Sequence, residues 1–141
     1  LVSLMGVYGG IHLEAGVTAQ ALVATVPEVL TEWTSDGISS GVTLDYTSDE
    51  ITIDHDGIYQ TEFTVSVSGI AGATFEIHLR KNDVDTNNGC EMKTANNDIQ
   101  CTSFSNQLSF VATDVITVWI ESDITGSITI THADLNVTRI G

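Results

Sequence analysis

The triplet Asp54-His55-Asp56, followed by Gly57, contains the residue types closest to those of a metal or catalytic site. Two carboxylates at alternate positions before a glycine resemble the beginning of a calcium-binding loop. No Asp, Asn or Glu occupies the later required spacings of such a loop before a strand-like run begins. The sequence therefore favours a turn in which the Asp side chains accept backbone N–H groups and Gly57 adopts a positive φ.

The other histidines lie in strand-like segments and lack the spacing of a zinc site. His12, His78 and His132 are far apart in the chain, and His78 alternates with Glu76 and Arg80 on one strand face. A catalytic histidine needs a nucleophile and an orienting acid, and the chain has no Gly-x-Ser-x-Gly elbow. We therefore expect polar or interface histidines, with no catalytic residue, no metal and no cofactor.

Two cysteines, Cys90 and Cys101, flank the sequence Glu91-Met-Lys-Thr-Ala-Asn-Asn-Asp-Ile-Gln100. If Ala-Asn-Asn-Asp forms a hairpin turn, the two strands that it joins would bring these thiols face to face. A disulfide between Cys90 and Cys101 is therefore geometrically allowed in an oxidising environment, and free thiols are the alternative.

Composition limits the classes of partner and reaction. The 141 residues contain 19 acidic and 4 basic side chains, with a net charge of −15, which disfavours nucleic acid and anionic membranes as partners. No run of 18 apolar residues is present, so we expect no membrane span. Two carboxylates could hydrolyse a glycosidic bond, but most acids lie in predicted turns and no pair stands out. We therefore expect a protein that is not an enzyme.

The chain reads as one all-β domain, because β-branched runs alternate with Gly, Asn, Asp and Ser turns every 8–12 residues. We expect an antiparallel two-sheet jelly-roll sandwich over residues 31–141, preceded by an N-terminal arm with the first strand or strands over residues 1–30. The expected strands include 6–13, 18–25, 41–47, 50–54, 57–69, 73–82, 101–111, 114–122 and 126–141. Apolar alternation shifts near His132, which predicts a β-bulge.

One predicted strand, Asp114 to Ser122, is apolar on both faces through residues such as Val118, Trp119 and Ile120. A sheet that exposes one face to water does not need this pattern. The second face would contact another subunit, in a cyclic dimer or trimer, or else a long covering loop of the same chain.

Four motifs of this sequence together resemble the tumour necrosis factor and complement globular-head superfamily. They are Gly57-x-Tyr59-x-x-x-Phe63, Leu79-x-Lys81-Asn82, the turn Val111-Ala-Thr-Asp-Val115 and the final apolar run with Leu135, Val137 and Ile140. Thr113 stands where that family usually has glycine. The resemblance implies a trimeric jelly roll, of the kind seen in bacteriophage head-decoration (cement) and fibre proteins. It covers residues 49–141 well and 8–48 weakly.

The resemblance and the doubly apolar strand lead to the same functional expectation. We expect a homotrimeric capsid decoration protein on the outer surface of a virion, bound to the major capsid protein over subunit junctions. The alternative is a receptor- or glycan-binding module of a phage fibre or spike, with recognition by the loops 35–41 and 82–89. The predicted trimer or core interface residues are Tyr59, Phe63, Trp119, Ile128, Ile130, His132 and Leu135. The predicted capsid contacts of the N-terminal arm are Val7, Tyr8, Ile11 and Leu13.

Overall fold

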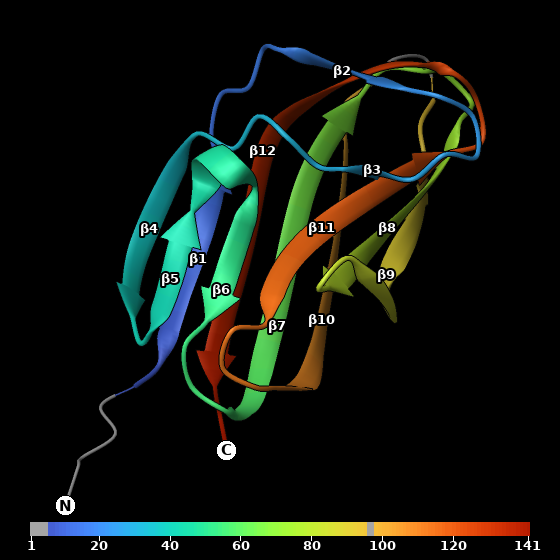
Figure 1. The fold of residues 1–141 in the computed structure, drawn as a ribbon. Coiled ribbons are helices and arrows are strands. Elements are labelled where there is room, and N and C mark those ends of the chain that lie inside the picture. The colour runs from blue at the N-terminus through green and yellow to red at the C-terminus, as the bar shows by residue number, and fades with distance from the viewer. Residues whose placement is uncertain (1–5, 96–97) are drawn as a thin grey trace, which may run out of the picture.

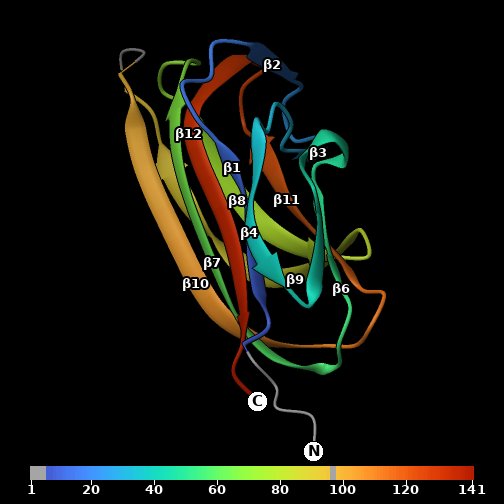
Figure 2. The same ribbon diagram turned by 90° about the vertical axis from the view of Figure 1, so that its left-hand side faces the viewer.

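A computed structural model describes residues 6–95 and 98–141 of the chain, which form two packed antiparallel sheets (Figures 1 and 2). Sheet A has the strand order β10-β7-β12-β1-β4, with β2 added alongside β12. Sheet B has the order β5-β6-β11-β8-β9, with β3 added alongside β11. The prediction of an all-β, two-sheet jelly-roll sandwich is confirmed. Within the described residues, no helix has the length and apolar character needed to cross a membrane.

The strands of sheet A include the longest in the molecule. Their bounds are β1 Tyr8–Leu13, β2 Ala19–Leu22, β4 Ser35–Ser40, β7 Gly57–Ser68, β10 Gln100–Phe110 and β12 Gly126–Arg139. The pairing of β12 with β7 shifts register between Ile130 and His132, which confirms the predicted bulge. Before the bulge, the inward-facing residues are the even-numbered Ile128 and Ile130. After it, they are the odd-numbered Ala133, Leu135 and Val137.

Sheet B contains shorter strands, and a turn of 3₁₀ helix joins two of them, β5 and β6. Their bounds are β3 Glu28–Val29, β5 Val42–Asp45, η1 Tyr46–Ser48, β6 Glu50–Ile53, β8 Thr74–Lys81, β9 Val84–Lys93 and β11 Val115–Ser122. The predicted loops 35–41 and 82–89 are mostly strand, since they contain β4 and the first half of β9. Both are edge strands that pair through the backbone, which does not require alternating apolar side chains.

The core lies between the two sheets and takes one face of nearly every strand. Tyr59 and Phe63 from β7, Phe75 from β8 and Phe110 from β10 are its largest fully buried side chains. Tyr59 packs edge-on against Phe110, with ring centroids 5.7 Å apart. The alternation of large apolar and small polar residues along β7 therefore places one face in the core and leaves the other outside.

The N-terminal strand is an integral part of the sandwich. β1 lies between β12 and β4 in sheet A, and Ile11 and Leu13 are fully buried in the core. Val7 is also buried, so the prediction that Val7, Ile11 and Leu13 contact a capsid is wrong. Tyr8, 37% exposed, is the only one of the four predicted contacts with a side chain available to a partner. The described part of the predicted N-terminal arm, residues 6–30, thus belongs to the two sheets through β1, β2 and β3.

The two faces of β11 differ in how far this chain covers them. Ile116, Val118 and Ile120 point into the core, and β3 runs beside β11. On the outer face, the guanidinium of Arg80 lies over the ring of Trp119, 4.2 Å from its centroid. The same chain therefore covers the inner face of β11 fully and its outer face in part, because Trp119 stays half-buried beneath Arg80.

Candidate functional site

The acidic triplet forms a turn that supports two neighbouring segments. The carboxylate of Asp54 accepts a hydrogen bond from Thr43 Oγ1 at 2.9 Å, and that of Asp56 accepts from the backbone N–H of Ala112 at 2.7 Å. His55 accepts from the hydroxyl of Tyr59 through its carbonyl oxygen. The predicted turn is found, but only Asp56 accepts a backbone N–H as expected, whereas Asp54 accepts a side-chain hydroxyl of β5. The turn is thus tied to β5 through Asp54 and to the turn after β10 through Asp56.

Gly57 is required for a different reason from the one predicted. It is absent from the glycines with positive φ, so the expectation of a left-handed backbone there is wrong. A side-chain Cβ at Gly57 would instead lie 2.7 Å from the carbonyl oxygen of Gly141. The left-handed position in this region is Thr113, with φ of 80°, where the resembled family usually has glycine. Thr113 thus adopts the left-handed backbone conformation at this turn, although glycine is the residue that favours this conformation.

The residues predicted for a trimer or core interface fall into two groups. Most of them lie within the core of this chain and cannot contact another subunit: Tyr59, Phe63, Ile128, Ile130 and Leu135. His132 is exposed on the outer side of sheet A, and Trp119 is half-buried on the outer side of sheet B. The predicted group therefore marks the core, and the two surface residues lie on opposite sides of the sandwich.

Both cysteines are free thiols, which is the second of the two alternatives that the sequence left open. Cys90 accepts a weak hydrogen bond from Thr102, which points inward from β10. Cys101, the preceding residue, points to the outer side of sheet A and lies 3.0 Å from Ser66 Oγ. Neighbouring residues of a strand point to opposite faces, so Cys101 faces away from Cys90. Burial raises the pKa of the Cys90 thiol, which favours its protonated form.

A cluster of carboxylates surrounds Asp49, which follows the 3₁₀ turn with a left-handed backbone of φ 62°. Burial raises the pKa of Asp49 to about 6, and the charges of Glu32, Asp45 and Glu50 contribute to the same shift. The ordinary value is 3.8, so the folded chain binds more protons than the unfolded chain between these values. The free energy of unfolding should therefore fall as pH rises from about 4 to about 6.

Replacing Asp49 by Asn is expected to stabilise the protein above pH 6 and to remove this pH dependence. The carboxyl is only half-buried, so solvent screening limits the gain to about 1 kcal/mol. Urea unfolding at pH 4, 6 and 8 measures it. Asp83→Asn is the matched control, since Asp83 is exposed and shares a left-handed backbone of φ 64°. Equal gains for both variants at pH 8 would assign the effect to the backbone and contradict the electrostatic explanation.

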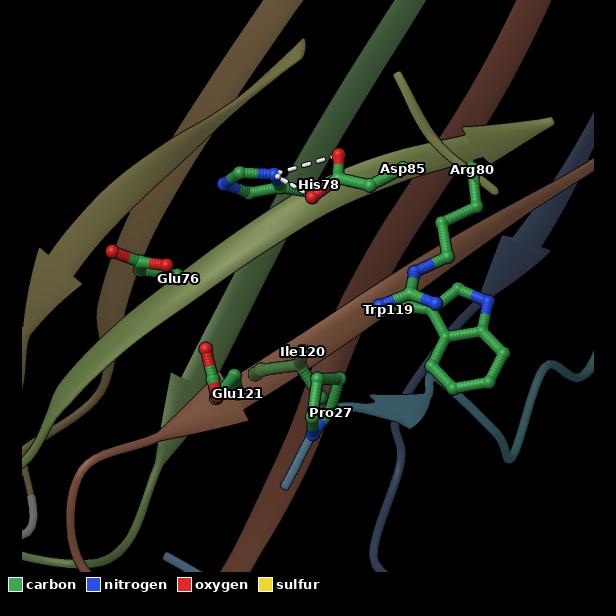
Figure 3. A pocket seen from close by; sticks show the side chains of 8 residues that line it. All are labelled: Pro27, Glu76, His78, Arg80, Asp85, Trp119, Ile120 and Glu121. Atoms are coloured by element: carbon green, nitrogen blue, oxygen red, sulfur yellow. Dashed lines mark hydrogen bonds and ion pairs between the residues drawn. The ribbon is translucent and has the colours of Figure 1, made fainter. Parts of the chain in front are cut away.

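A small cavity on the outer side of sheet B brings the strongest group of functional side chains together (Figure 3). It has a volume of about 40 Å³. Its lining residues come from β8, β9, β11 and the segment before β3: Pro27, Glu76, His78, Arg80, Asp85, Trp119, Ile120 and Glu121. We call it the Trp119 cavity. Cross-strand register explains the grouping, because Trp119 lies opposite His78 and Glu121 lies opposite Glu76.

The charges in the Trp119 cavity are partly satisfied within the chain. His78 Nδ1 lies 3.0 Å from both carboxylate oxygens of Asp85. Burial alone would raise the pKa of Asp85, but hydrogen bonds from His78 and the Asn87 N–H, with the charge of Arg80, outweigh it and lower the pKa. Sequence reasoning placed Glu76, His78 and Arg80 on one outward face, which is confirmed, but it did not join them to Trp119.

Metal-binding geometry is not found in the part of the chain that the structure describes, where no three His, Cys, Asp or Glu side chains group as ligands. A second contact between a histidine and a carboxylate lies on the other sheet. There, His12 Nδ1 lies 2.5 Å from a carboxylate oxygen of Asp134 on the outer side of sheet A. The side chains that the Trp119 cavity offers can donate and accept hydrogen bonds and provide an aromatic wall, which is the chemistry of a binding site.

Solved structures with this fold are numerous, although their sequences are distant from this chain. Eiger TNF from S. frugiperda is 11% identical, with a TM-score of 0.69 over 96% of this chain and 93% of that chain. The globular domain of zebrafish complement 1qA protein is 13% identical, with a TM-score of 0.62 over 96% of this chain and 98% of that chain. Murine APRIL at pH 5.0 is 13% identical, with a TM-score of 0.66 over 94% of this chain and 99% of that chain.

No family model and no curated protein matches the sequence. At 11–13% identity, the structural likeness concerns the fold and extends over nearly the whole of each chain. The chain is therefore a β-sandwich with the jelly-roll fold of tumour necrosis factor and complement globular domains.

Proposed function

We propose that this chain is a non-enzymatic structural module that assembles as a homotrimer and decorates the outer surface of a viral capsid. The observation that carries the assembly is the uneven distribution of charge between the two sheets. The outer sides of β10, β7, β12 and β1 contain only two acidic residues, Glu62 and Asp134, and Asp134 is paired with His12. We call this surface the neutral face.

A neutral face of this extent is unusual on a chain with a net charge of −15. The outer side of sheet B shows the contrast, since Glu91, Glu76 and Glu121 lie directly opposite one another on β9, β8 and β11. Burying unpaired charge between subunits costs free energy, so the neutral face is the side that a second copy can cover with the smallest desolvation penalty.

An apolar seam beside the neutral face supports the same assembly. Where β9 lies beside β10 at the open side of the sandwich, four side chains pack against the core but remain partly exposed: Cys90, Met92, Phe104 and Leu108. A closed ring of subunits would cover this seam with the neutral face of the next copy, and a ring leaves no unsatisfied interface. Trimers of the complement and tumour necrosis factor kind give the subunit number that we propose.

Replacing Thr64 by Arg is expected to convert the trimer into a monomer. Thr64 is exposed near the middle of β7 on the neutral face, so a long charged side chain would prevent close approach without disturbing the core. Light scattering coupled to gel filtration should give about 45 kDa for the wild type, three times the 15.0 kDa chain, and one chain for the variant. Thr52→Arg, on the outer side of β6, is the matched control and should remain trimeric. A monomeric wild type at micromolar concentration would refute the assembly.

The decoration role rests on what a trimer built in this way leaves outside. Its outer surface would be rigid and acidic, and apolar side chains remain exposed at the ends of the sandwich, among them Val23 and Ile124 at one end and Ile140 at the other. Three copies of a weak end-on contact bind a multivalent capsid surface much more tightly than one copy does. The partner would be the major capsid protein, at junctions between its subunits.

Heads of the phage that encodes the chain provide the test of this role. Purified protein added to heads that lack it should bind to saturation and raise the temperature at which the heads release their DNA. Thr64→Arg, which abolishes the trimer, should bind at least tenfold more weakly through the loss of avidity. Heads with unchanged heat and pressure resistance would refute the decoration role and leave the trimer intact.

A further inference from the structure

We propose that a hollow on the outer side of sheet A receives apolar side chains of the next copy of this chain, with Ile38 as the main contact at its rim. The hollow has a volume of about 380 Å³ and lies over β12, β1 and β4, which are neighbours in the sheet (Figure 2). We call it the β1–β4 hollow. This contact presupposes the trimer proposed above and names the part of its interface where shape selects the partner. The rim and floor of the hollow include Tyr8, Gly10, His12, Ile38, Asn136 and Thr138.

Two glycines keep the β1–β4 hollow open. A side-chain Cβ at Gly10 would lie 2.8 Å from the carbonyl oxygen of Leu135, and one at Gly37 would lie 3.0 Å from the carbonyl oxygen of Gly10. Neither position accepts a side chain while the three strands keep their spacing. The outer surface of the sheet is therefore recessed where these two side chains are missing.

A β-bulge in β4 directs Ile38 into solvent at the rim of the hollow. The register of β4 against β1 shifts at Gly10, where Gly37 and Ile38 both lie opposite one residue. Bulges of this kind re-aim a side chain out of the regular alternation of a strand. Ile38 is 80% exposed, although it is the one large apolar residue of β4. A partner that filled the hollow would remove this apolar side chain from water, which its own chain does not do.

The lining of the β1–β4 hollow favours an uncharged occupant. Among the described residues, no Asp, Glu, Lys or Arg lines it, and the imidazole of His12 is already paired with the carboxylate of Asp134. An ionic ligand would lose its hydration there without gaining an opposite charge. An apolar group meets no such penalty, and it would cover Ile38 at the same time.

Continuity with the neutral face identifies the occupant as a second copy. Tyr8 and His12 lie on the outer side of β1, and Asn136 and Thr138 lie on that of β12. Both sides belong to the neutral face, so a subunit that covers this face also covers the hollow. In a closed ring, that subunit presents its apolar seam. The flexible thioether of Met92, one member of the seam, can adapt to a recess of irregular shape.

Replacing Ile38 by Asp tests the contact. Because Ile38 is 80% exposed, the fold should be unaffected, but a charge would enter each of the interfaces of the ring, where its burial is unfavourable. Light scattering coupled to gel filtration should give one chain at the micromolar concentration where the wild type is a trimer. Val23→Asp is the matched control, since Val23 is 55% exposed at the end of the sandwich, and this variant should remain trimeric.

Filling the hollow separates a contact selected by shape from general apolar association. Thr138→Trp adds an aromatic ring on the exposed side of β12, so the surface becomes more apolar while the recess closes. The concentration at which half of the trimer dissociates should rise at least about tenfold, because the side chain of the next copy loses its space. Thr52→Trp, the same change on the outer side of β6, should leave this concentration unchanged.

The outcomes distinguish this contact from the trimer itself. A trimeric wild type whose Ile38→Asp and Thr138→Trp variants dissociate no more readily would overturn the contact and leave the trimer standing. A Thr138→Trp trimer tighter than the wild type would also overturn it, since the hollow would then be ordinary apolar surface. A monomeric wild type would instead refute the proposed assembly and the contact with it. Circular dichroism identical to that of the wild type shows for each variant that a lost trimer is not a lost fold.

Discussion

Replacing Phe63 by Ala is expected to lower the free energy of unfolding by about 3–5 kcal/mol, because the substitution leaves a large cavity in a closed core. Phe63 has no exposed surface. Its ring packs edge-on against Trp33, with centroids 6.4 Å apart, and lies tilted against Phe104 at 5.3 Å. Trp33 is held in turn by a hydrogen bond from its indole N–H to the carbonyl of Leu30. Neighbours fixed in this way cannot relax into the vacated space.

Urea unfolding in the Thr64→Arg background measures this loss without a contribution from assembly. Phe104→Ala is the informative comparison, since Phe104 contacts the same ring but lies in the apolar seam and remains partly exposed. Its loss in that background should be only about 1–2 kcal/mol, while in the wild-type background it should also weaken the trimer. Equal losses for the two variants in the monomeric background would show that the seam is as closed as the core.

Apolar periodicity predicted the strands that supply the core, but not the polar edge strands. β7, β8 and β12 alternate apolar and polar residues, and their faces were assigned correctly, including the bulge before His132. β4 has the sequence Ser-Asp-Gly-Ile-Ser-Ser, and its one large apolar residue, Ile38, is 80% exposed. The backbone of such a strand pairs with β1, and local sequence carries no signal for that pairing.

The candidate binding site could be predicted only in part, since cross-strand register decides it. Alternation placed Arg80 outward on β8, but nothing local to Trp119 indicates that Arg80 would cover its ring. Register also separates Cys90 from Cys101, whose spacing suggested that they meet. Register also brings together two motif residues that are distant in sequence. Asn82 and Asp114 are 32 positions apart, and their side chains form a hydrogen bond. The resemblance identified both residues, and the structure supplies the reason that they occur together.

Replacing Asp114 by Ala is expected to cost about 2–4 kcal/mol, which would be among the largest losses from a polar substitution in this chain. Asp114 is 6% exposed at the end of the β10–β11 turn. One carboxylate oxygen accepts from Asn82 Nδ2 and the other from the backbone N–H of Val111, each at 2.9 Å. Asn82 completes the clamp by accepting from the N–H of Val115 at 2.9 Å. Alanine would leave two partly buried donors without acceptors, which costs more than the bonds themselves contribute.

Asp123→Ala provides the matched control, because Asp123 also accepts a backbone N–H, that of Thr74 at 2.8 Å, but on the exposed surface. Water can replace that acceptor, so the loss should stay below about 1 kcal/mol. Asp114→Asn should fall between the two, since its amide oxygen can accept one of the two bonds while its NH₂ group opposes the other donor. Thermal and urea unfolding of the three variants rank them directly. Equal losses in the free energy of unfolding for Asp114→Ala and Asp123→Ala would contradict this explanation. Burial would then not determine how much the hydrogen bonds of Asp114 stabilise the protein.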